Sequence, residues 1–95
     1  MTSIPHLDDL RAARERISAA VHRTPTVSSR SLTEQVGRPV LLKCENLQKT
    51  GSFKVRGALN RILDLDDEAR QRGVVTISAG NHAQGVALSG RHLGI

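Results

Sequence analysis

Apolar residues recur at the three- and four-residue spacing of an amphipathic helix in three stretches of the chain. In the first stretch, residues 7–21, charged residues separate four apolar ones, which are Leu7, Leu10, Ile17 and Val21. The second stretch runs from about residue 53 to residue 65, and the third runs from residue 81 to residue 92. We therefore predict three long helices.

Shorter elements are predicted between these helices. The apolar run 40–44 and the β-branched run 74–77 are typical of buried strands. A short helix is predicted over about residues 29–36, and a helical turn over residues 66–73. Residues 45–52 are predicted to form a polar loop. Helices and strands thus alternate, which indicates an α/β fold with the beginning of a parallel sheet.

The size of the chain limits what this fold can be. A domain of 95 residues buries only about 60% of the surface of its unfolded chain. Two or three strands with so few large side chains are too few to close a sheet. We therefore expect the sequence to be the N-terminal part of a longer protein.

Composition places the chain among ordinary globular proteins. Hydrophobic residues make up 38% of the sequence, and no apolar run approaches the roughly 20 residues that span a bilayer. The first residues contain no basic cluster followed by an apolar stretch, so no signal peptide is expected. The single cysteine, Cys44, excludes an internal disulfide and a cysteine-based zinc site. We expect a cytoplasmic protein that has no membrane segment.

A net charge of +5 raises the question of nucleic-acid binding. Phe53 is the only aromatic residue, so the chain cannot build a stacking platform for bases. The basic residues are also interspersed with acidic ones, as in residues 8–11 and 66–70. We expect solvated charged surfaces and no nucleic-acid partner, with a basic nucleic-acid-binding module as the alternative.

Common phosphate-binding and metal-binding motifs are absent from the sequence. The glycine that a phosphate-binding loop needs before Lys49 and Thr50 is missing, and Gly-x-Gly-x-x-Gly does not occur. The histidines lack the spacing of metal ligands; they are His6, His22, His82 and His92. No metal site is expected.

Lysine is the informative residue type, because only three of the 14 basic residues are lysines: Lys43, Lys49 and Lys54. A lysine amine becomes nucleophilic when its charge is disfavoured by apolar burial, a nearby cation or a helix N-terminus. For Lys54, the neighbours Phe53 and Arg56 and the predicted helix start offer all three. The alternative is a lysine at a helix start whose amine simply reaches water.

A second candidate site is the turn at residues 78–82, Ser-Ala-Gly-Asn-His, between a predicted strand and a predicted helix. Small residues there allow backbone N–H groups to converge at a helix N-terminus, which suits a carboxylate or a phosphate. The alternative is a simple turn in which Asn81 caps the helix.

These two segments together resemble a known family. Residues 52–58, Ser-Phe-Lys-Val-Arg-Gly-Ala, are followed 22 residues after Ala58 by Gly-Asn-His-Ala-Gln-Gly at residues 80–85. The pair resembles the fold-type II pyridoxal-phosphate enzymes, and within them the threonine/serine dehydratases and serine racemases. The resemblance also includes residues 23–25 and 45–51. It implies the N-terminal portion of a tryptophan-synthase-β-like open-sheet architecture, in which residues 1–50 begin the large cofactor domain and residues 51–95 begin the small domain.

The resemblance also implies roles for individual residues. Lys54 would hold pyridoxal phosphate as an imine, Phe53 would pack beside the pyridine ring, and Asn81 would donate to the phenolic oxygen of the cofactor. The carboxylate of the substrate would lie among residues of the second turn, which are Ser78, Ala79, Gly80, Asn81 and His82. Lys49 and Thr50 are candidates for contact with a nucleotide effector, with a plain surface loop as the alternative.

The implied reaction is the deamination of a small hydroxy amino acid. The lysine amine freed by the substrate takes the α-proton, the β-hydroxyl leaves, and a keto acid and ammonia are released. Threonine would give 2-oxobutanoate and serine would give pyruvate, in isoleucine biosynthesis or threonine catabolism. The racemases carry a serine acid/base where this chain has Ala79, so elimination is favoured over racemisation.

The resemblance leaves other readings open. The glycine-rich loop that binds the cofactor phosphate in the family lies further along than residue 95. The 95-residue chain by itself is therefore expected to be inactive, and the full-length form is expected to be a homodimer or larger. The alternatives are a serine racemase-like enzyme, and an inactive relic or accessory protein that pairs through exposed sheet edges.

Overall fold

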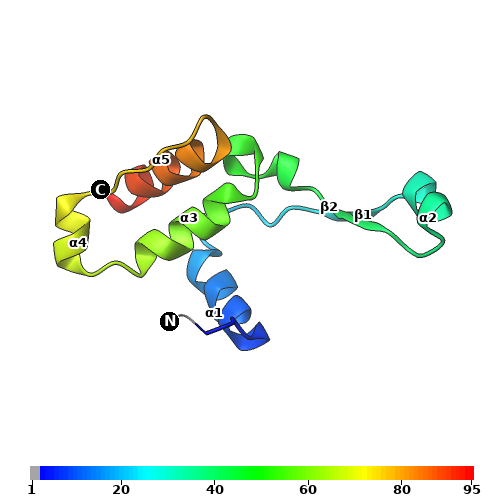
Figure 1. Cartoon of the computed structure of the whole chain (residues 1–95), viewed down its shortest axis with the longest axis horizontal. Coiled ribbons are helices and arrows are strands. Elements are labelled where there is room, and N and C mark those ends of the chain that lie inside the picture. Colours follow the sequence, from blue (N-terminus) through cyan, green and yellow to red (C-terminus); the bar gives the residue numbers. More distant parts are fainter. Residues whose placement is uncertain (1–2) are drawn as a thin grey trace.

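Two helices that pack side by side, α3 (Lys54–Leu63) and α5 (Asn81–Leu93), form the centre of the chain. The computed structural model describes residues 3–95; Met1 and Thr2, the first residues assessed for a signal peptide, lie outside the described residues. α3 buries an apolar face against α5, made by Val55, Ala58, Leu59 and Ile62. α5 presents two small buried residues to this interface, Gly85 and Ser89. Both helices begin at the same end of the pair (Figure 1).

Helix α1 (Leu7–Ile17) contacts α3 and ends earlier than the predicted residue 21. Ile17 is buried, and beyond it the chain turns through short-range bonds such as that of the Ala20 N–H with the Ile17 carbonyl, 2.9 Å. The turn brings His22 to Gln48, whose side chain bonds both backbone groups of His22 at 2.8 Å. These long-range bonds replace the last helical turn that the apolar spacing predicted.

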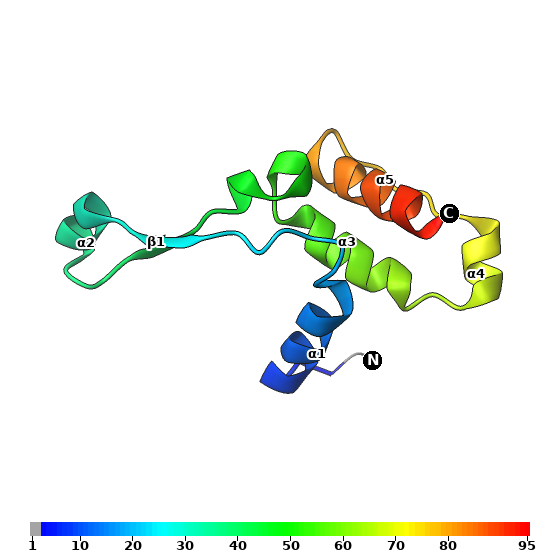
Figure 2. The ribbon, with the colours of Figure 1, turned by 180° about the vertical axis from the view of Figure 1, so that it is seen from behind.

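The only strands in residues 3–95 form one antiparallel pair, β1 (Thr26–Ser28) with β2 (Leu41–Lys43). Between them lies α2 (Arg30–Val36), capped by the Ser29 hydroxyl, which accepts from the Leu32 N–H at 3.3 Å, and ended by Gly37 at φ 78°. The pair projects away from the helices and carries α2 at its tip (Figure 2). The predicted strand 40–44 is confirmed in its central residues, but the predicted beginning of a parallel sheet is wrong for the described part of the chain.

Residues 74–77, predicted to be a strand, are extended but unpaired. Val75 is 95% exposed and Ile77 is fully exposed. A strand requires a partner for its backbone N–H and C=O groups, and none of the described segments pairs with this one. The segment instead leads back from α4 (Asp67–Arg72) to the start of α5.

The predicted polar loop 45–52 contains two short 3₁₀ turns, η1 (Glu45–Leu47) and η2 (Lys49–Gly51). Thr50 at φ 64° and Gly51 at φ 75° both have left-handed backbone conformations. Such a conformation is uncommon for a β-branched residue, so the surroundings must hold Thr50 in place. Across residues 3–95, no helix is both long enough and apolar enough to cross a membrane.

Candidate active site

The packing of α3 on α5 brings the two motifs together. A Cβ atom at Gly85 would lie 3.0 Å from the backbone nitrogen of Val55 and 3.1 Å from the carbonyl carbon of Lys54. Only a glycine permits so close an approach between the two backbones without displacement. Asn81 precedes Gly85 by one turn, about 6 Å along the helix axis. The start of α5 therefore lies about one helical turn from the contact with Lys54, which is the first residue of α3.

Lys54 is exposed at the start of its helix. Its Nζ atom lies 5.4 Å from the centroid of the Phe53 ring, and its backbone N–H donates to the buried Ser52 hydroxyl at 3.4 Å. Among residues 3–95 no acidic side chain forms an ion pair with Lys54. The amine is therefore accessible to a ligand and stands on a helix whose first turn is anchored by buried contacts.

The turn before α5 has the open geometry of an anion-binding site. Gly80 occupies the N-cap position, and no side chain of the described residues caps the helix there. The predicted alternative of a turn capped by Asn81 is therefore wrong, since Asn81 is the first helical residue. The Ser78 hydroxyl accepts from the Gly80 N–H at 3.2 Å and shapes the turn. The N–H groups of the first helical turn remain available to an anion, which the helix dipole favours at this end.

Arg56 does not act as the cation beside Lys54 that the sequence suggested. Its guanidinium is engaged by Glu45 in a two-point ion pair, of which the Nη2–Oε2 contact is 3.1 Å. The Arg56 hydrogen bond lowers the pKa of Glu45 to about 2, against the opposing effect of burial. The same hydrogen bond raises the pKa of Arg56. Sequence reasoning gave Glu45 no role, because a pair 11 residues apart across an irregular loop has no periodic signal.

Lys49 and Thr50, the candidates for contact with an effector, lie on η2. Lys49 borders a hollow of about 40 Å³ together with Leu88 and His92, in the C-terminal half of α5. The Thr50 hydroxyl oxygen is buried and has no hydrogen-bond partner among the described residues. η2 thus contacts α5, and Lys49 lies beside the C-terminal half of that helix.

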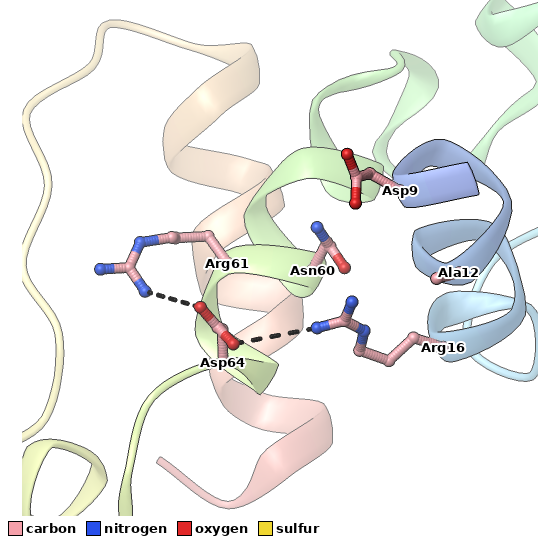
Figure 3. Close-up of a pocket in the computed structure, with 6 residues that line it drawn as sticks. All are labelled: Asp9, Ala12, Arg16, Asn60, Arg61 and Asp64. Carbon is pink, nitrogen blue, oxygen red and sulfur yellow. Dashed lines mark ion pairs between the residues drawn. The ribbon is translucent and has the colours of Figure 1, made fainter. Parts of the chain in front are cut away.

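Two larger hollows are lined neither by Lys54 nor by the turn at residues 78–82. One, of about 290 Å³, is formed between α1 and α3, where Asp64 pairs with Arg16 at 3.9 Å and with Arg61 at 3.8 Å (Figure 3). Another, of about 590 Å³, lies between α1, β2 and α3. Neither is lined by Lys54 or Asn81. Within residues 3–95, no three or more metal-binding side chains cluster.

Comparison with known proteins identifies the family. The profile of the family named pyridoxal-phosphate dependent enzyme matches residues 17–95. The chain belongs to this family, which confirms the resemblance and the cofactor that it implied.

Individual relatives are named for different reactions. The chain is 54% identical over 89 residues to L-threonine ammonia-lyase of Thermotoga maritima, covering 94% of this chain and 22% of that protein. It is 51% identical over 85 residues to L-threo-3-hydroxyaspartate ammonia-lyase of a Pseudomonas species, covering 90% of this chain and 27% of that protein.

A solved structure of maize serine racemase superposes with a TM-score of 0.83 at 52% identity, covering 94% of this chain and 28% of that one. The chain thus spans about a quarter of the length of the proteins it matches. It corresponds to a mixed helix and strand portion of a fold-type II enzyme.

Proposed function

We propose that the protein is a pyridoxal-phosphate-dependent ammonia-lyase that converts L-threonine to 2-oxobutanoate and ammonia, or serine to pyruvate, with Lys54 as the catalytic lysine. The observation that carries the proposal is the contact of Gly85 with the Lys54 backbone. The contact brings the backbone of Lys54, whose amine is exposed, within about one helical turn of the uncapped N-terminus of α5. An amine for the cofactor aldehyde and N–H donors for a carboxylate are the two groups that such a reaction requires.

The residues of the two motifs have the chemistry that the cofactor and the substrate require. Lys54 would hold pyridoxal phosphate through Nζ, Phe53 would cover the pyridine ring, and Asn81 would donate to the phenolic oxygen. Residues 78–82 would hold the substrate carboxylate with backbone and side-chain donors. When bound, the cofactor supplies an electron sink for the bond broken at the α-carbon.

The chain's own residues then have simple tasks. The Lys54 amine takes the α-proton, so it must reach the substrate from the start of α3. The turn at residues 78–82 keeps the carboxylate fixed while the β-hydroxyl leaves. Ala79 has no group that carries a proton, which favours elimination over proton return to the opposite face.

Racemisation of serine is the second candidate, because maize serine racemase is among the solved structures similar to this chain. The two reactions give different products from serine. Pyruvate is measured as a keto acid, and D-serine is measured by chiral chromatography. We expect keto acid from threonine or serine without D-serine; D-serine formed faster than pyruvate would overturn the choice of elimination.

The lysine itself is tested by chemical trapping. The protein, in the form its source makes, is reduced with borohydride and digested, and the pyridoxyl group is located by mass spectrometry. We expect the group on Lys54, and its loss together with activity in Lys54→Ala. Lys43→Ala and Lys49→Ala are the matched controls and should keep the adduct. An adduct that persists in Lys54→Ala would refute the assignment.

A further inference from the structure

A polar cluster beside the candidate site joins three segments of the chain. We call it the Glu45 cluster; it consists of the side chains of Thr24, Glu45, Gln48 and Arg56 and the backbone of His22. Thr24 is 5% exposed and Gln48 is 4% exposed, so both are withdrawn from water. Buried polar groups are costly unless they are hydrogen-bonded. The bonds within the cluster are therefore strong constraints on how the three segments lie.

The first set of bonds ties the segment before β1 to the loop. The Gln48 side chain accepts from the His22 N–H and donates to the His22 carbonyl, each at 2.8 Å. The Thr24 hydroxyl donates to Glu45 Oε2 at 2.5 Å. These bonds tie residues 22–24 to residues 45–48.

The second set of bonds ties these residues to α3. Arg56 pairs with Glu45 through Nε and Nη2, and Nη2 also donates to the His22 carbonyl at 3.2 Å. Arg56 follows Lys54 by two residues, in the same first turn of the helix. The pair closes a loop that contains Thr50 in a left-handed conformation. Such a conformation costs energy and persists only where the surrounding structure enforces it. The cluster is thus a brace on the loop that leads directly into Lys54.

We propose that Glu45 and Arg56 are positioning residues for Lys54. Their ion pair holds the loop 45–52 closed and sets the direction in which the first turn of α3 presents the lysine amine. The inference rests on the proposed role of Lys54. Without the pair, the amine is chemically unchanged but misplaced, and a displacement of about 1 Å from the reacting atoms can cost about 100-fold in rate.

The proposal is tested in the cofactor-loaded protein with Arg56→Gln and Glu45→Gln. We expect kcat to fall by about 10- to 100-fold in each variant. The KM for the amino acid should stay within about twofold, because the turn at residues 78–82 is left intact. Borohydride trapping on Lys54 should still occur. The double variant should lose no more than either single one, since both changes break the same pair.

Two further variants separate positioning from general stability. Arg56→Lys keeps the charge and should regain part of kcat. Arg72→Ala removes an exposed ion pair with Glu68, 2.9 Å long and on α4, and should leave kcat unchanged. Circular dichroism and thermal melting give the folded fraction of each variant at the assay temperature.

Each outcome is decisive. A loss of kcat at an unchanged folded fraction, partly restored in Arg56→Lys, supports the proposal. Unchanged kcat in folded Arg56→Gln overturns it, and so does a loss that the unfolded fraction fully accounts for. Should Arg56→Gln not fold, Glu45→Gln decides instead, because it removes the negative charge that pairs with Arg56, and an unchanged kcat there also overturns the proposal. An unmodified Lys54 in the wild-type protein would instead refute the proposed function.

Discussion

A methyl group added at Gly85 tests whether the contact between α3 and α5 sets the place of Lys54. The added Cβ would lie 3.0 Å from the Val55 nitrogen, 3.1 Å from the Lys54 carbonyl carbon and 3.2 Å from the Lys54 carbonyl oxygen. Optimal separations between such atoms are about 3.5–4.0 Å. All three neighbours are backbone atoms, which cannot rotate away as a side chain would. The two helices must therefore part by about 0.5 Å at the start of α3.

Two opposing effects determine the size of the change. Overpacking costs about 1–3 kcal/mol. Alanine in place of glycine inside a helix stabilises the folded protein by about 1 kcal/mol. We expect Gly85→Ala to lower the free energy of unfolding by up to about 2 kcal/mol. The matched control is Gly57→Ala in α3, where nothing lies within 4 Å of the added Cβ, and it should stabilise the protein by up to about 1 kcal/mol.

The assay is urea unfolding of both variants, with borohydride trapping on Lys54 as the functional readout. We expect the two variants to differ by about 1–3 kcal/mol, with slower trapping in Gly85→Ala alone. Gly85→Ala that stabilises as much as Gly57→Ala would show that the helices separate without cost. The close contact would then not be what places Lys54.

Three further predictions concern stability. Because the pKa of Glu45 is lowered in the folded protein from 4.5 to about 2, its ion pair stabilises fully above about pH 4.5, and the stabilisation is lost as the pH falls toward about 2. Urea unfolding across this range should show a shallower pH dependence in Glu45→Gln, and a wild-type slope in that variant would contradict the assignment. Leu59 is 2% exposed, and Leu59→Ala should lower the free energy of unfolding by about 2–5 kcal/mol. Leu41 is 66% exposed, and Leu41→Ala should lower it little. Equal losses of stability in the two variants would rule out α3 as the core. Asp66→Ala removes the acceptor of the Ala69 N–H, 2.8 Å away, and should cost about 1 kcal/mol and speed amide exchange in α4, while Asp66→Asn retains most of the cap.

The sequence by itself determined the elements whose signals are local. The helices predicted over residues 53–65 and 81–92 are confirmed as α3 and α5, because apolar spacing is a property of neighbouring residues. The short helix 29–36 is confirmed as α2 for the same reason. The Lys54 and Asn81 motifs indicated the pyridoxal-phosphate family, since a short lysine motif and a small-residue turn are recognisable without a structure.

Only the tertiary structure decided which distant segments meet. β2 pairs with β1 rather than with residues 74–77, and no local property of these segments states which partner is present. Gly85 reads in sequence as an ordinary helical glycine, and only packing shows that it lies on the Lys54 backbone. Arg56 reads as a cation for Lys54, yet it pairs with Glu45 across the loop. Strand pairing, close helix contacts and ion pairs depend on partners remote in the chain, and periodicity carries no information about them.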